Sequence, residues 1–395
     1  MLVFFVLKRY NKSMANVYDE KLNILVTCAS GIEKATKKEL ERLGFNETQA
    51  INGEIALKGD ALSIARLNVN LRTADRVYLK ITEFKAETFD QLFDGVKTVL
   101  WQNYFPKDAK VLVNGKCVRS QLFAVSACQS IVKKALSDRL CKAYGVNYMR
   151  ETGATYSLEF RIFKDNCELL LDTTGTGLHK RGYRDMVGIA PIRETLASAL
   201  VLMSDYYYKR PFADPFCGSG TIAIETARIA LNIASGKDRK FAFNGWKNFD
   251  EKYIKLALEE ANDKEIRTCK PQIFASDIDP KAIKLARHHA ERAGVADVIN
   301  FAVKDVKDFS LNLSGGTIVT NPPYGERVYD LDEARKCYKD FGKAYKKLDG
   351  WSAFVITSAK CFQNDFGKKA DRERKIFNSN RECRFFYYYA DKKGF

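Results

Sequence analysis

The chain has 395 residues, 46% of them hydrophobic and 29% charged, with a formal net charge of +16 and a pI near 9.2. This composition excludes a disordered chain and an integral membrane protein, and the length predicts two or three domains. The positive charge favours a polyanionic partner, because Lys and Arg gain affinity by displacing counterions from phosphates. A lysine-rich composition without any binding role is the alternative.

The first ten residues, MLVFFVLKRY, form the only membrane-like run. They are too short to span a bilayer, and neither a basic leader nor a small-residue cleavage site accompanies them. We expect residues 1–20 to be an N-terminal extension, with Met14 as an alternative start, on a cytoplasmic protein without a membrane partner. The ten cysteines and three histidines show no metal-ligand spacing, so we expect reduced thiols and no metal.

Residues 21–70 predict a small α/β unit. LNILVTCASG (Leu22–Gly31) is typical of a strand, and IEKATKKELERLGF predicts a helix that ends at Gly44. Short strands near residues 53–57 and a helix over residues 61–67 complete the unit.

Residues 71–172 predict a second module without a catalytic cluster. Strands are expected at 76–86 and 110–118, helices at 88–105 and 130–146, and a hairpin at 156–175 that turns at Lys164-Asp165-Asn166. Between Lys116 and Arg150 there are seven basic residues and one acidic residue. The pattern indicates a module that binds a polyanion. Its candidate contacts, with those of the basic run that follows, are Lys116, Arg119, Lys133, Lys134, Lys142, Lys180, Arg181 and Arg184.

After a Gly-rich, basic linker at 173–190, residues 191–395 alternate strands with helices. Helices are expected at 191–207, 221–231, 280–294 and 334–348, and strands at 210–216, 271–277, 298–305, 316–323 and 352–359. This alternation predicts a Rossmann-like α/β domain with a mostly parallel sheet covered on both faces. The β-rich runs at 374–380 and 384–390 are expected to form an antiparallel hairpin on the sheet edge.

The run ADPFCGSGTIAIETA places Asp214 at a strand end, then Gly218-x-Gly220, then a helix that begins near Thr221. The glycines let the backbone approach a ligand, and the helix N-terminus offers free N–H donors. With Ala223 the run also fits the loose dinucleotide fingerprint, which leaves a nicotinamide oxidoreductase open.

Two features argue against the dinucleotide interpretation. Asp214 precedes the glycines, where it can take the charged amino group of an amino-acid-bearing ligand. The next acids, Asp277 and Asp279, lie almost sixty residues beyond the glycines, whereas a ribose acid is expected about twenty residues on. Asp277 can still bind ribose hydroxyls with Ile278 against an adenine face, and Asp305 can accept from the adenine amine. Acids at three successive strand ends predict a ligand crevice.

The run TIVTNPPYGERV leaves its strand through two prolines, neither of which has a backbone N–H. Two successive prolines hold the exit in a stiff, extended path. A rigid loop after a buried strand would also explain them when they are considered alone.

Together these motifs resemble the class I S-adenosylmethionine-dependent methyltransferases that modify exocyclic amines, over roughly residues 191–390. With LVTCASGIEKATKKEL and the basic module, the whole chain resembles the ferredoxin-like–THUMP–methyltransferase RNA methylases, and most closely the bacterial 23S rRNA guanine-N2 methyltransferases. The resemblance implies a ferredoxin-like subdomain at 21–70, a THUMP RNA-binding domain at 71–172 and a methyltransferase domain at 191–395. It also implies large-subunit ribosomal RNA as the partner, and it leaves the oligomeric state open.

The resemblance assigns site residues as well. S-adenosylmethionine is expected on Asp214, Phe216, Gly218, Gly220, Thr221, Asp277, Ile278, Asp279, Asp305, Val306 and Asn321. The catalytic element is expected to be Asn321, Pro322, Pro323 and Tyr324. Some relatives are two-enzyme fusions with a second methyltransferase domain; this sequence shows one, so we expect a single modification.

An exocyclic amine is a poor nucleophile because its lone pair is spread into the ring. Acceptors on its two N–H groups localise that pair, and the Asn321 side-chain oxygen and the Pro322 carbonyl are the candidates. Tyr324 is expected to stack on a base turned out of its helix. Adenine 6-amino methylation of RNA or DNA, guanine methylation in tRNA, and an RNA-binding protein with a decayed catalytic domain remain alternatives.

Overall fold

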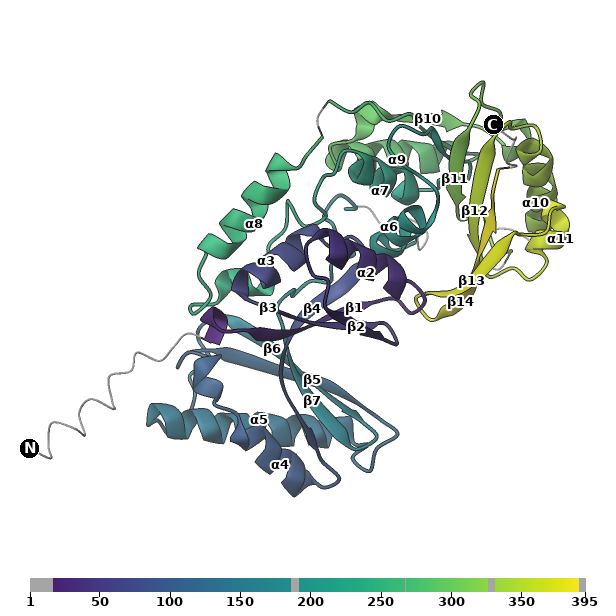
Figure 1. Ribbon diagram of the computed structural model, residues 1–395. Coiled ribbons are helices and arrows are strands. Elements are labelled where there is room, and N and C mark those ends of the chain that lie inside the picture. The colour runs from purple at the N-terminus through teal and green to yellow at the C-terminus, as the bar shows by residue number, and fades with distance from the viewer. Residues whose placement is uncertain (1–16, 186–191, 267, 326–330, 391–395) are drawn as a thin grey trace, which may run out of the picture.

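The computed structural model describes residues 17–185, 192–266, 268–325 and 331–390. Most of the expected N-terminal extension, with Met14, lies outside these residues, as does Pro191 at the expected start of a helix. Two seven-stranded sheets organise the described chain, one in each half (Figure 1). None of the helices in these four segments is both long and apolar enough to cross a membrane.

The first sheet is continuous across the two predicted N-terminal units. Its order is β2-β3-β1-β4-β7-β6-β5, and only β5 and β6 pair in parallel. The long strand β4 (Ala74–Lys85) pairs with β1 on one side and β7 on the other, so it joins the two units through hydrogen bonds. The other strands are β1 (Leu22–Cys28), β2 (Thr48–Ile51), β3 (Glu54–Gly59), β5 (Lys110–Val118), β6 (Thr155–Phe163) and β7 (Asn166–Asp172).

Helices cover the two ends of this sheet on opposite sides (Figure 1). Asp60 caps the start of α3 by accepting from the Ser63 amide, and Gly145, at φ +61°, ends α5. The hairpin predicted to turn at Lys164-Asp165-Asn166 has a two-residue turn: Lys164 and Asp165 lie at φ +50° and +63°, and Asn166 already begins β7. The helices are η1 (Val17–Asp19), α2 (Glu33–Arg42), α3 (Ala61–Asn70), α4 (Phe89–Thr98), η2 (Trp101–Asn103) and α5 (Val125–Tyr144).

The second sheet is doubly wound, as the alternation of elements predicts. Its order is β10-β9-β8-β11-β12-β14-β13, parallel from β10 to β12, with β13 and β14 as the expected antiparallel hairpin on one edge. The strands are β8 (Phe212–Asp214), β9 (Ile273–Asp277), β10 (Ile299–Val303), β11 (Gly316–Thr320), β12 (Trp351–Thr357), β13 (Arg372–Asn378) and β14 (Arg381–Tyr388).

Hydrophobic clusters lie on both faces of this sheet. One contains residues of α6 (Glu194–Met203), α7 (Thr221–Ala230) and α9 (Pro280–Arg292), and the other contains residues of α10 (Leu331–Tyr345) and α11 (Phe362–Phe366). The short helices η3 (Ala242–Gly245), η4 (Ala296–Val298) and η5 (Val306–Asp308) lie in connections. The fold class predicted from the sequence is confirmed.

Helix α8 (Lys252–Asp263) was not predicted. It packs against α3 of the N-terminal half, where Glu260 accepts from the Arg66 Nε at 2.7 Å (Figure 1). In the connection that leads from α7 to α8, Ser235 Oγ donates to the Leu71 carbonyl at 2.7 Å. Trp246 and Ala257 belong to the same hydrophobic cluster as β1 and β4. The C-terminal half therefore supplies part of the N-terminal half's core.

Candidate active site

The centre of the second sheet brings two predicted motifs together. Asp214 is the last residue of β8, and Asn321 directly follows the neighbouring strand β11. The hydroxyl of Thr320 donates to Asp214 Oδ1 at 2.6 Å, so the two strand ends are hydrogen-bonded. In a doubly wound sheet, the crevice at these carboxyl ends is where ligands bind.

The loop after β8 contains polar groups without a partner. Asp214 is buried, and its Oδ2 accepts no hydrogen bond from the described residues, nor do Ser219 Oγ and Thr221 Oγ1 have a partner there. Burial raises the pKa of Asp214 to about 7, although hydrogen bonds from Thr320 and the Phe216 amide oppose the shift. Buried polar atoms are rarely left unpaired, so three around one loop indicate the place of a polar ligand.

Of the two glycines in this loop, Gly220 allows close packing against α9 and Gly218 leaves the backbone open to a ligand. Gly220, at φ +84°, would bring an added Cβ within 3.0 Å of Ala286 Cβ on α9. Gly218, at φ +50°, would place one in open space, so the backbone there is accessible to a ligand. His289 Nδ1 donates to the Ser219 carbonyl at 3.2 Å, which holds the loop from the side of α9.

Asp277 occupies the end of β9, next to the same loop. Its Oδ2 accepts from the Gly218 amide at 2.9 Å and its Oδ1 from the Asp279 amide at 3.0 Å. Each carboxylate oxygen keeps a further lone pair, which leaves capacity for a diol. Asp279 caps α9 by accepting from the Lys281 amide at 2.8 Å. Ile278, which lies between the two acids, is 51% exposed.

Two further residues predicted to bind the cofactor, Asp305 and Val306, follow β10. Asp305 accepts from the Lys307 amide at 3.0 Å and from Lys307 Nζ at 3.1 Å. Burial would raise the pKa of Asp305, but these bonds outweigh it and leave the pKa below its ordinary value. Val306 is buried, and the Phe216 ring lies edge-on to Phe341 at 5.3 Å between centroids.

The Asn321-Pro322-Pro323-Tyr324 element is held by neighbouring side chains. The Tyr324 hydroxyl donates to Asn321 Oδ1 at 2.6 Å, and the Tyr338 hydroxyl of α10 donates to the Pro323 carbonyl. The guanidinium of Arg381 lies over one face of the Tyr324 ring, 5.6 Å from its centroid. Tyr338 was not among the predicted residues, because its helical spacing with other aromatic residues indicates burial but not this bond.

The predicted RNA contacts divide into exposed and internal groups. Five of the side chains are exposed: Lys116, Arg119, Lys134, Lys142 and Lys180. Lys133 is half-buried and donates to the Val111 carbonyl at 2.6 Å and to Glu151. Arg184 is also half-buried, with Glu194 at 3.1 Å.

The prediction for Arg181 is wrong. Its side chain is fully buried, and the guanidinium donates to the Leu178 carbonyl at 2.6 Å and to the Arg72 carbonyl. Because backbone carbonyls inside the protein take these donors, Arg181 joins chain segments together and presents no charge to RNA.

Three family models match the chain. The "RlmL ferredoxin-like domain" matches residues 23–78, the "THUMP domain" residues 86–172, and the "RMKL-like, methyltransferase domain" residues 181–386. Among curated proteins, "Putative RNA methyltransferase YpsC" of Bacillus subtilis (strain 168) is 43% identical over 94% of this chain and 97% of that protein. "Ribosomal RNA large subunit methyltransferase K/L" of Psychromonas ingrahamii is 30% identical over 92% of this chain but 49% of its own length.

Solved structures agree. SMU.472, crystallised with S-adenosylhomocysteine, is 36% identical with a TM-score of 0.91, covering 95% of this chain and 100% of that one. A "predicted N6-adenine-specific DNA methylase" from Listeria monocytogenes is 42% identical with a TM-score of 0.90, covering 94% and 97%. The loop between β8 and α7 (residues 215–220, the donor loop) and the acids at the strand ends agree with these similarities. The chain belongs to the RMKL-like methyltransferase family and takes S-adenosylmethionine as its cofactor.

Proposed function

We propose that the protein methylates the exocyclic amine of an RNA base, and that this amine is the 2-amino group of a guanine in large-subunit ribosomal RNA. The observation that carries the proposal is the Thr320–Asp214 hydrogen bond, which holds the donor loop beside Asn321. The match to the THUMP domain and the exposed lysines of α5 support RNA as the substrate. The name of the Psychromonas relative supports ribosomal RNA of the large subunit.

The residues around the β8 loop suit the methyl donor. S-adenosylmethionine supplies an electrophilic methyl group on a sulfonium. The unpaired Oδ2 of Asp214 can accept from the donor's ammonium group, and Asp277 has lone pairs for its ribose hydroxyls. The exposed Ile278 side chain offers an apolar face for adenine, and Asp305 offers an acceptor for its amine.

The residues after β11 suit the amine. Asn321 Oδ1 and the Pro322 carbonyl accept from the two N–H groups, which localises the nitrogen lone pair. The Tyr338 hydroxyl on the Pro323 carbonyl stiffens this acceptor pair. Burial raises the pKa of Tyr324 well above its ordinary value, so the phenol stays protonated at neutral pH and donates to Asn321. The half-buried Tyr324 ring, with Arg381 over one face, is the proposed stacking surface for the base.

This proposal assigns residues 71–172 to RNA binding, residues 191–395 to catalysis, and the cytoplasm as the location. Mass spectrometry of ribosomal RNA methylated in vitro, using RNA from a strain that lacks the gene, tests the base. We expect N2-methylguanosine in large-subunit RNA. A 6-methyladenosine product in RNA or DNA, or methylguanosine in tRNA, would contradict the guanine or ribosomal assignment. Absence of any methylated nucleic acid would contradict the whole proposal.

A further inference from the structure

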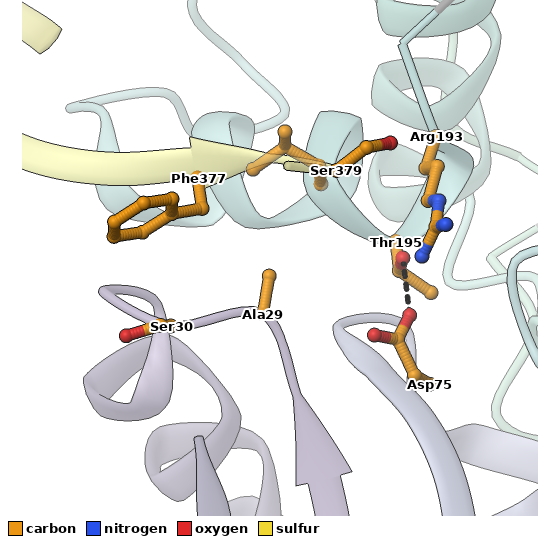
Figure 2. Close-up of a pocket in the computed structure, with 8 residues that line it drawn as sticks. Ala29, Ser30, Asp75, Arg193, Thr195, Phe377 and Ser379 are labelled. Carbon is orange, nitrogen blue, oxygen red and sulfur yellow. Dashed lines mark hydrogen bonds between the residues drawn. The ribbon is translucent and has the colours of Figure 1, made fainter. Parts of the chain in front are cut away.

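A cleft of about 400 Å³ lies where the two halves of the molecule meet (Figure 2). It is separate from the donor loop. Three segments line it: the β1–α2 loop with the start of β4, the first turn of α6, and the tip of the β13–β14 hairpin. The lining residues are Ala29, Ser30, Asp75, Arg193, Thr195, Leu196, Phe377 and Ser379.

The cleft adjoins the proposed base site through the hairpin. Phe377 and Ser379 flank Asn378, which pairs across the ladder with Arg381, and the Arg381 guanidinium lies over the Tyr324 ring. Ala29 also packs against the hydrophobic cluster that Tyr324 contacts. The same hairpin therefore contributes side chains to this cleft and to the surroundings of Tyr324.

The groups facing the cleft match a nucleotide. Figure 2 shows Phe377 and Ser379 above Ala29 and Ser30, with Arg193 near the Thr195–Asp75 pair. Arg193 is exposed and forms no ion pair with any described residue, so its charge is available for a phosphate. Lys375 Nζ lies over the half-buried Phe377 ring, 5.2 Å from its centroid, and the rest of the ring offers a surface for a base to stack on.

Asp75 supplies an acceptor at the same place. Thr195 Oγ1 donates to its Oδ1 at 3.0 Å, which fixes the carboxylate, while Oδ2 has no hydrogen-bond donor in the described parts of the chain. A fixed carboxylate oxygen can accept from the exocyclic amine of a base. The volume is also within the range of about 300–1,000 Å³ typical of small-molecule pockets.

We propose that this cleft is a second nucleotide subsite, which holds the base next to the methylated one in the same RNA strand. Phe377 stacks on that base, Arg193 contacts its phosphate, and Asp75 favours a base with an exocyclic amine. The inference rests on the proposed RNA substrate and adds a source of sequence preference at a position where no chemistry occurs.

The test uses the full chain and a short synthetic RNA centred on the nucleotide that mass spectrometry identifies. Each neighbour of the target is replaced in turn by an abasic nucleotide, which keeps the phosphate and removes the base. For the wild type, one of the two replacements should raise KM about tenfold with little change in kcat, the size expected when one base no longer stacks. Phe377→Ala should show the raised KM on intact RNA, with no further penalty for the abasic RNA. Phe377→Tyr should restore wild-type behaviour.

Arg193→Ala should raise the KM for intact RNA and for abasic RNA by the same factor, because a phosphate contact does not depend on the base. Tyr208→Ala and Arg372→Ala are matched controls: both side chains are exposed and lie outside the cleft, so KM should not change. Unchanged donor affinity and melting temperature show that each variant folds.

Equal abasic penalties in wild type and Phe377→Ala, or no penalty at either neighbour, would overturn the subsite. Competition by free guanosine monophosphate that Phe377→Ala abolishes, without an abasic effect, would indicate a metabolite site and would also overturn it. Failure of the proposed function is distinguishable, because no RNA would then be methylated by any variant.

Discussion

Asp214 is a buried carboxyl whose neighbours satisfy only one of its two oxygens. With a pKa of about 7 in the folded protein, it is largely protonated at pH 6 and largely ionised above pH 7.5. An α-amino group has an ordinary pKa of about 7.7–8.0 and stays mostly charged over this interval. In the proposed site the ionised carboxylate is the form that accepts from the donor's ammonium, and its population rises with pH.

We expect the affinity for S-adenosylmethionine to increase roughly fivefold to tenfold from pH 6 to pH 7.5, as expected for one proton released on binding. Calorimetry over this pH range measures it. Asp214→Asn should bind more weakly and lose most of the pH dependence. An unchanged pH profile in Asp214→Asn would assign the titration to another group.

Asn321 is expected to act on the amine and not on the donor. Asn321→Ala should lower turnover about a hundredfold to a thousandfold, the usual cost of one pre-organised polar group at a reacting centre, with donor affinity nearly unchanged. Tyr324→Phe is the matched control, because it keeps the ring and removes only the hydroxyl that donates to Asn321. We expect it to cost about tenfold, as for one hydrogen bond. Single-turnover kinetics measures both, and full activity in Asn321→Ala would contradict the mechanism.

Local sequence pattern predicted several helices and strands correctly. Strand β5 has the predicted bounds, and the turn at Lys164 and Asp165 follows from their neighbours in sequence. Contacts between distant segments could not be predicted. The Thr320–Asp214 bond joins residues 106 apart, and helix α8 was missed because nothing local shows that Ile254, Ala257 and Ala261 would bury against another domain.

The hairpin β13–β14 approaches the N-terminal half most closely at Gly31, among the contacts that the described residues show. Gly31 has φ +96°, and a Cβ there would stand 2.6 Å from the Lys375 carbonyl oxygen. Arg374 also donates to the Gly31 carbonyl at 3.0 Å. The hairpin that carries Phe377 and Arg381 is therefore held in place by backbone approach at Gly31.

We expect Gly31→Ala to destabilise the protein by about 2–5 kcal/mol, from left-handed strain plus overpacking. Gly44→Ala is its matched control: Gly44 has φ +92° but no atom within 4 Å of the added Cβ, so only the strain of about 1–2 kcal/mol applies. Urea unfolding monitored by circular dichroism gives both values. Equal losses in the two variants would show that the approach to Lys375 is not tight.

The two halves of the protein are joined by buried polar groups as well as by apolar packing. Arg181 was predicted as an RNA contact as part of the Gly-rich, basic run at 173–190. In the fold it donates to the Leu178 and Arg72 carbonyls, with Glu225 of α7 at 3.8 Å. Local composition cannot distinguish a solvated arginine from one buried between domains.

The exposed lysines of α5, Lys134 and Lys142, can be tested as RNA contacts by charge reversal. Lys134 and Lys142 are exposed on α5, whereas Lys133 is already paired with Glu151, so the first two are the residues to change. Lys134→Glu combined with Lys142→Glu should weaken RNA binding and reduce its salt slope by about two, one for each phosphate that the protein no longer neutralises. Fluorescence anisotropy with ribosomal RNA fragments, titrated over salt concentration, measures the slope, and donor affinity should not change.

Charge reversal at Lys346 and Lys347, exposed just beyond α10, makes the same change in net charge on the methyltransferase half and should leave the slope nearly unaltered. If both double variants change RNA binding equally, the effect comes from net charge alone. The lysines of α5 would then be a solvated surface, and RNA would have to bind elsewhere on the molecule.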